Sequence, residues 1–187
     1  MMVLRSRIKT FAGLAPRYRS LRAMGVNTAA MTQAAGATSM LYGCELTGVA
    51  DSMLHDARVA AAHAATTGYG GKNLDRTFNA VDGAKGTADP AFLAHVGPIK
   101  AWALAWWERW QPIEELDNAF WSAERLQRNS SSIVWRIVAG PAAAAHASAI
   151  RLGWTWQDAH TAVTEAGRVV DCIMDPPAVV TNCSEVG

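Results

Sequence analysis

Apolar side chains recur at the spacing of an α-helix along nearly the whole sequence. In the clearest case, Ile113, Leu116, Phe120, Ala123 and Leu126 fall on one helical face. Runs of alternating β-branched residues are absent, and turn-forming residues stand between the helical segments. The pattern therefore predicts an all-α fold, an irregular bundle of about six to eight helices with a basic N-terminal helix and a disordered C-terminal tail.

The predicted helices are bounded by residues that start or stop a helix. Asn27 can cap a helix that Gly43 ends, and Pro112 suits the first turn of another. The β-branched residues between 131 and 139 would also suit a strand, but they lack strict alternation, which favours helix. We expect helices over residues 3–13, 27–42, 51–64, 89–110 (kinked or restarted at Gly97-Pro98), 112–128, 141–152 and 155–173.

Changes of composition divide the sequence into segments. Residues 67–88 hold five glycines among polar side chains, which predicts a flexible loop with one turn of helix around Phe78. The predicted organisation is a basic N-terminal helical segment (1–25), a helical hairpin (26–66), that loop (67–88), a C-terminal helical subdomain (89–174) and a tail (175–187).

Basic side chains are concentrated at the N-terminus. The first 44 residues contain six cations and no acid, although the whole chain has a formal charge of only +1. A stretch of this kind attracts phosphate, on nucleic acid or on a membrane surface, and binds it in a salt-dependent and sequence-independent way. The candidate nucleic-acid-binding residues are Arg5, Arg7, Lys9, Arg17, Arg19 and Arg22.

The same segment has the features of a mitochondrial targeting leader. It is rich in arginine, lacks acids and places Leu4, Ile8 and Phe11 on one helical face. The alternative function is therefore a helical protein-interaction module with such a leader. Eight tryptophans, including a stripe at Trp102, Trp106 and Trp110, would supply either a core or an interaction surface.

Patterns that indicate catalysis or metal binding are missing from the sequence. The three cysteines are widely spaced, and the five histidines form neither HxxxH nor HExxH. The glycine-rich stretch 68–73 departs from a phosphate loop at Thr66 and Asn73. A GxSxG motif and an apolar run of membrane-spanning length do not occur. We expect a protein that is not an enzyme, holds no metal or cofactor and has no membrane span.

Four short motifs follow one another in an order that is found elsewhere. Residues 40–49 (MLYGCELTGV) resemble the segment after the polymerase palm of non-LTR retrotransposon reverse transcriptases, where a hydrophobic helix ends in Tyr-Gly-x-Glu. Asp89-Pro90, residues 98–103 (PIKAWA) and Gly140-Pro141 leading to residues 151–154 (RLGW) agree in order. The similarity is closest to divergent retroelement proteins of some single-celled algae and covers most of the chain.

The resemblance implies the thumb and C-terminal region of a reverse transcriptase, an RNA-directed DNA polymerase, separated from its palm. In that family the helices after the palm pack along the primer–template duplex, and the cations from Arg5 to Arg22 occupy the corresponding place. The palm aspartates have no counterpart here, so no catalytic residue is carried over. The implied partners are an RNA–DNA or DNA duplex, bound weakly, and a missing palm domain. The implied location is nuclear or cytoplasmic, with the mitochondrion as the alternative.

Overall fold

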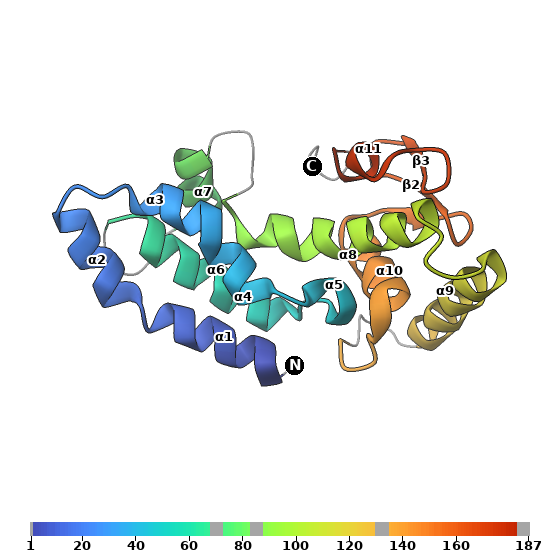
Figure 1. Cartoon of the computed structure of the whole chain (residues 1–187), viewed down its shortest axis with the longest axis horizontal. Helices are drawn as coiled ribbons and strands as arrows, with labels where there is room; N and C mark the ends of the chain where they lie inside the picture. The colour runs from blue at the N-terminus through green and yellow to red at the C-terminus, as the bar shows by residue number, and fades with distance from the viewer. Residues whose placement is uncertain (1, 68–72, 83–87, 130–134, 183–187) are drawn as a thin grey trace. The chain divides into compact units, whose positions relative to one another are not determined.

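The computed structural model describes residues 2–67, 73–82, 88–129 and 135–182, which are mostly helical (Figure 1). The predicted all-α class is confirmed, with one small antiparallel sheet as the exception. The chain forms two compact units. Unit 1 comprises residues 1–42 and 49–93, and unit 2 comprises residues 43–48 and 94–187.

Unit 1 is organised around α6 (Asp51–Ala65), which α1 (Met2–Ala12), α2 (Ala15–Ala23), α3 (Thr28–Met31), α4 (Ala37–Leu41) and α7 (Leu74–Asp82) all contact. Small side chains on α6 let these helices approach closely, because Ala57, Ala61 and Ala62 are completely buried. Within unit 1, α1 and α7 lie on opposite sides of α6 (Figure 1).

The helix that begins after Asn27 follows the prediction at both ends. The Asn27 side chain accepts a hydrogen bond from the Ala30 amide at 3.0 Å, as an N-cap residue does. The helical path continues through α3, a π-helical turn η1 (Thr32–Gly36) and α4, and it ends before Gly43, whose φ is +88°. A Cβ atom at Gly36 would lie 3.0 Å from the Phe11 ring, so a small residue there lets α1 pack closely.

Unit 2 has an aromatic core. It contains α5 (Cys44–Thr47), most of α8 (Pro90–Trp107), α9 (Ile113–Arg128), α10 (Gly140–Arg151) and α11 (Pro177–Asn182). Trp102 is 2% exposed, stacks on Phe120 with ring centroids 6.2 Å apart, and donates its indole N–H to the Ala159 carbonyl at 2.8 Å. Trp156 also packs edge-on against Phe120, with ring centroids 5.1 Å apart. The hydrogen bond satisfies the one polar atom of Trp102 inside an apolar core.

The helix predicted over residues 155–173 is wrong. This segment forms a three-stranded antiparallel sheet of β1 (Thr155–Trp156), β2 (Thr161–Val163) and β3 (Val169–Asp171), in the order β1-β2-β3. Gly167 at φ +79° allows the turn between β2 and β3, where the Thr164 amide donates to the Arg168 carbonyl at 2.9 Å. Strand pairing therefore satisfies the backbone of a segment whose apolar spacing also fitted a helix.

Several helix boundaries also differ from the prediction. Within the stretch expected to be a loop, α7 is a helix of nine residues, while residues 68–72 and 83–87 lie outside the described residues. The helix expected to reach Trp110 ends at Trp107. Residues 135–139 are not helical, and 130–134 lie outside the described residues. In the segment expected to be a disordered tail, α11 is helical and residues 183–187 are not described.

Candidate nucleic-acid interface

All six basic residues predicted to bind nucleic acid lie on α1 or α2. The apolar residues between them on α1 face inward, since Leu4, Ile8 and Phe11 are 4–6% exposed. The helix is therefore amphipathic, with its apolar face in the core of unit 1 and basic residues elsewhere on its surface.

Arg7 and Arg22 are both bound to other groups of the protein. Arg7 donates a hydrogen bond to the Tyr42 carbonyl and lies over the Tyr42 ring, with its guanidinium carbon 5.1 Å from the ring centre. Arg22 donates through Nε to Thr28 Oγ1 at 3.0 Å and through Nη2 to the Ala64 carbonyl, in the last turn of α6. Both side chains connect their helix to another part of unit 1, which gives them a structural role.

The other four cations are exposed. Arg5, Lys9 and Arg17 make no hydrogen bond or ion pair with another residue that the structure describes, and Arg19 is exposed on the same helix as Arg17. Arg5 and Lys9 are four residues apart on α1, so they are neighbours on one helical face. Their charges are therefore available to a polyanion in solution.

A groove runs between α6 and the two N-terminal helices of unit 1. It consists of two hollows of about 380 and 370 Å³, and we call it the α6 groove. Its first hollow lies between α1 and α6, and its second lies between α2 and the end of α6. The residues that line it are Arg5, Ile8, Lys9, Ala12, Ala15, Met53, Asp56, Val59, Ala60 and His63 in the first hollow, and Ala15, Arg19, Arg22, Ala23, His63, Thr66 and Thr67 in the second.

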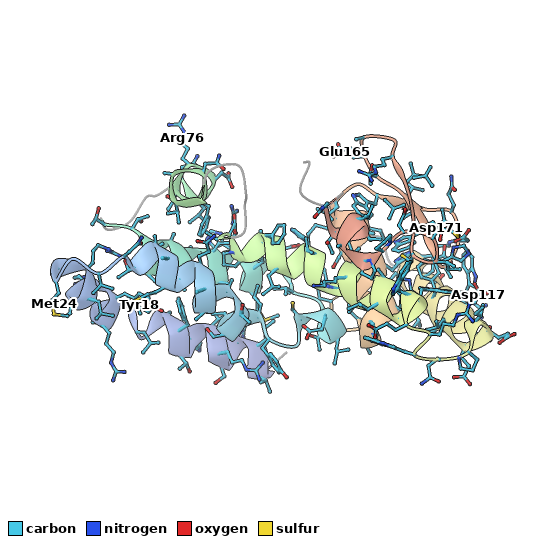
Figure 2. All side chains as sticks on the ribbon, turned by 45° about the horizontal axis from the view of Figure 1, so that its top comes forward. Tyr18, Met24, Arg76, Asp117, Glu165 and Asp171 are labelled. Carbon is cyan, nitrogen blue, oxygen red and sulfur yellow. The ribbon has the colours of Figure 1, made fainter. Side chains whose placement is uncertain are left out.

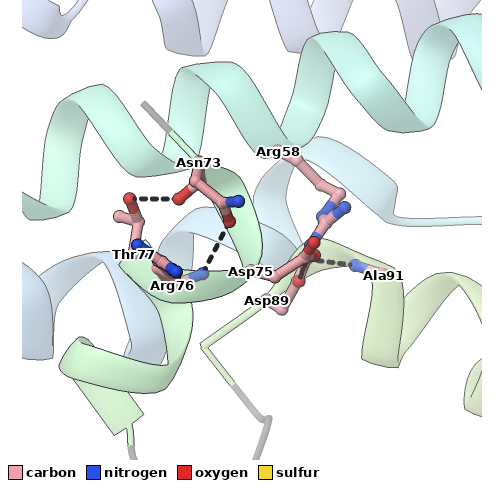
Figure 3. A network of polar contacts seen from close by, with 7 residues as sticks. All are labelled: Arg58, Asn73, Asp75, Arg76, Thr77, Asp89 and Ala91. Atoms are coloured by element: carbon pink, nitrogen blue, oxygen red, sulfur yellow. Dashed lines mark hydrogen bonds and ion pairs between the residues drawn. The ribbon is translucent and has the colours of Figure 1, made fainter. Parts of the chain in front are cut away.

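Sequence reasoning did not identify Arg58, the centre of an ion-pair network in unit 1 (Figure 3). Its Nε donates to both carboxylate oxygens of Asp89 at 2.9 and 3.0 Å, and its Nη2 bonds Asp89 and Asp75 at 2.6 Å each. Burial lowers the pKa of Arg58, but its hydrogen bonds to the two aspartates outweigh burial and raise that pKa overall. Asp89 also accepts the Ala91 amide at 2.9 Å, so the network fixes the beginning of α8.

An exposed cation on α7 was also missed. Arg76 extends from α7 into solvent (Figure 2), and its backbone amide donates to the Asn73 side chain at 3.0 Å. The helix that carries Arg76, α7, lies across α6 from α1, the helix that carries Arg5 and Lys9 (Figure 1). Arg76 is a basic residue that the sequence shows plainly, but it lies in the segment predicted to be a flexible loop.

A buried pair of polar side chains lies in unit 2. His146 Nδ1 lies 2.9 Å from Gln127 Oε1, and Gln127 Nε2 donates to the Ala143 carbonyl at 3.1 Å. Because the Gln127 oxygen is an acceptor, the neutral His146 ring carries its proton on Nδ1. Burial lowers the pKa of His146, which favours that neutral form.

Cys44 and Cys172, the cysteines that the structure describes, show no sign of activation. Burial raises the pKa of Cys44 to about 12, with Glu45 adding to the effect, and burial likewise raises the pKa of Cys172 to about 12. Among the described residues, no three His, Cys, Asp or Glu side chains gather as metal ligands would. Lys72 and Cys183 lie outside the described residues.

Within the described part of the chain, no helix combines the length and the apolar character needed to cross a bilayer. No protein-family model, curated protein or solved structure matches this chain significantly.

Proposed function

We propose that unit 1 is a non-catalytic module that binds the sugar–phosphate backbone of nucleic acid through α1 and α2. The observation that carries the proposal is the set of exposed cations, Arg5, Lys9, Arg17 and Arg19, on two consecutive helices. The sequence of unit 1 contains ten lysines and arginines against five aspartates and no glutamate, a formal charge of +5. An excess of this size attracts a polyanion to the unit as a whole.

The internal hydrogen bonds of Arg7 and Arg22 support binding in another way. Arg7 and Arg22 attach α1 and α2 to the rest of unit 1 through the Tyr42 and Ala64 carbonyls. The exposed cations therefore stand on anchored helices, and less conformational entropy is lost when they meet phosphates. Contacts to phosphate carry no base information, so the binding is sequence-independent and weakens steeply with salt.

We further propose that the chain corresponds to the region after the palm of a retroelement reverse transcriptase. Support comes from the order of the four sequence motifs, each of which falls at a helix start, a helix end or inside α8. Reading the genomic DNA immediately upstream of Met1 tests this origin. An in-frame palm with its acidic pair would support it, and an unrelated open reading frame would contradict it.

Backbone binding is tested by filter binding of the full chain to duplex DNA and to an RNA–DNA hybrid at two salt concentrations. We expect both ligands to bind, with affinity falling by orders of magnitude between about 50 and 200 mM salt. Undetectable or salt-insensitive binding of a folded sample would contradict the proposal.

A matched pair of variants locates the binding face. Lys9→Gln removes an exposed cation from α1, and Arg76→Gln removes one from α7 on the other side of α6. We expect Lys9→Gln to lower the slope of log affinity against log salt by about 1, and Arg76→Gln to change it less. Equal effects would place the binding surface elsewhere.

A further inference from the structure

The α6 groove has a chemistry that differs from a simple phosphate-binding surface. Its two hollows adjoin, because Ala15 and His63 line both. The lining residues on α6 and just beyond it run from Met53 to Thr66, a length of about 20 Å at the rise of an α-helix. Each hollow has the volume of a small-molecule site, and together they form an elongated site.

The two hollows of the groove differ in net charge. The first hollow has an aliphatic floor formed by Ile8, Met53 and Ala60, all less than 9% exposed, and by the half-buried Val59. Four exposed residues also line it: Arg5, Lys9, Asp56 and His63. The second hollow is lined by Arg19 and Arg22 and by no carboxylate. The only carboxylate of the groove's described lining, Asp56, lies in the first hollow. Each hollow therefore has two cationic side chains, but the second has the larger net positive charge, because the only carboxylate lies in the first.

Arg22 is already oriented to bind an anion in the second hollow. Its bonds to Thr28 Oγ1 and to the Ala64 carbonyl fix the guanidinium group and use two of its five N–H donors. The carbonyl groups at the end of α6 would repel an anion, but Arg22 already covers one of them, that of Ala64. The remaining donors of Arg22, together with Arg19, can meet a carboxylate.

We propose that the α6 groove binds a long-chain fatty acid. The carboxylate lies between Arg19 and Arg22, and the alkyl chain lies along Ile8, Met53 and Val59. A single-stranded nucleic acid would instead need flat aromatic platforms for its bases, and among the described lining residues only His63 has a ring. This binding goes beyond the proposed backbone contact and does not depend on it.

The direct test is displacement of a fluorescent fatty-acid probe from the full chain by palmitate, below the concentration at which palmitate forms micelles. Hexadecanol has the same alkyl chain and no charge, so it serves as the comparison. We expect palmitate to bind about tenfold more tightly or better, because the alcohol loses the charge-assisted hydrogen bonds. Failure of palmitate to displace the probe, or equal affinity for the two compounds, would overturn the proposal.

A matched pair on α6 tests the apolar floor. Val59→Glu places a carboxylate over the position of the alkyl chain, and His55→Glu places one on an exposed position of α6 that lines neither hollow. We expect Val59→Glu to lower palmitate affinity about tenfold or more and His55→Glu to lower it by much less. Circular dichroism of both variants checks that they fold, and equal losses in two folded proteins would overturn the proposal.

A second pair separates the fatty-acid site from the nucleic-acid surface. Arg19 lines the second hollow, whereas Arg17, two residues earlier on α2, is exposed and lines neither hollow. We expect Arg19→Gln to reduce both palmitate and DNA binding, and Arg17→Gln to reduce DNA binding alone. If Arg17→Gln weakens palmitate binding as much as Arg19→Gln does, the effect is one of general surface charge and the proposed site is wrong.

Discussion

Units 1 and 2 differ in how they use charge and aromatic side chains. Unit 1 has a formal charge of +5 and no tryptophan, whereas unit 2, with seven lysines and arginines against eleven acids, has a formal charge of −4 and all eight tryptophans. The core of unit 1 combines aliphatic side chains and Phe11 with close alanine contacts on α6, whereas tryptophan and phenylalanine rings form the centre of unit 2.

The opposite charges of the two units indicate that an anion would bind to unit 1. The chain is nearly neutral because its two units have opposite net charges. The positively charged unit contains α1 and α2, whose exposed cations Arg5, Lys9 and Arg17 make no hydrogen bond or ion pair with another described residue. The segregation also gives a convenient readout, because tryptophan fluorescence reports on unit 2 alone, while circular dichroism reports on both units.

The largest expected effect tests whether α1 belongs to the core of unit 1. Phe11→Ala removes a ring that is 6% exposed and in contact with Gly36, so we expect a loss of about 3–5 kcal/mol in the free energy of unfolding. Urea unfolding followed by circular dichroism measures it, with exposed Thr10→Ala as the control at under about 0.5 kcal/mol. An unchanged stability would favour a detachable leader, the alternative interpretation of this segment.

In unit 2 the next effect concerns a glycine at which any side chain would be strained and would clash with a neighbouring ring. Gly48 has φ +60° and ψ −175°, and a Cβ atom there would lie 2.4 Å from Trp135 Cζ3. Backbone strain and overpacking together predict that Gly48→Ala lowers the free energy of unfolding by about 3 kcal/mol. Gly43→Ala, at φ +88° with nothing within 4 Å, should cost only about 1–2 kcal/mol. Tryptophan fluorescence during urea unfolding compares the two, and equal losses would contradict this packing.

The Arg58 network predicts unequal roles for its two aspartates. The Asp89 side chain is 15% exposed and also caps α8, while the Asp75 side chain is 76% exposed. Asp89→Asn should therefore lower the free energy of unfolding by about 1–3 kcal/mol, and Asp75→Asn should lower it by less than about 1 kcal/mol. Thermal unfolding by circular dichroism ranks the pair, and the reverse order would show that Asp75 is the main partner of Arg58.

The smallest expected effect is a dependence of the stability of unit 2 on pH, which comes from His146. Because burial lowers the pKa of His146 in the folded state, the unfolded chain binds more protons near its ordinary pKa of about 6.5. This contribution to stability is complete above that pH and is lost as the pH falls, by at most about 1.4 kcal/mol per pH unit. Unfolding at several pH values, followed by tryptophan fluorescence, should show this loss in the wild type and a smaller slope in His146→Gln. An identical slope in both would contradict it.

Local signals in the sequence were sufficient for most of the helices and failed where tertiary pairing decides. Asn27, Gly43 and the Pro112 boundary act through their own backbone, so their positions could be predicted. The spacing of Val163 and Val170 suits either a helix or a pair of strands, and only Gly167, with its turn conformation, distinguishes them. Whether such a segment forms a helix or strands depends on pairing between strands, which the sequence of one segment does not specify by itself.

The candidate site could be predicted only in part, for a related reason. Charge concentration identified all six basic residues of α1 and α2, but it could not show that Arg7 and Arg22 are bound to carbonyl groups. Those bonds join residues 35 and 42 positions apart in sequence. The α6 groove likewise depends on how α1 and α2 pack against α6, which the helical pattern does not encode.

The central claim is that unit 1, and not the total charge of the chain, binds nucleic acid. Two triple variants that remove the same charge test it most directly: Arg5→Gln/Lys9→Gln/Arg17→Gln in unit 1, and Arg125→Gln/Arg136→Gln/Arg168→Gln at exposed positions of unit 2. The measurement is the slope of log affinity for duplex DNA against log salt concentration. We predict that the first variant lowers this slope by about 3 and that the second leaves it nearly unchanged. Equal slopes for the two variants would contradict the account.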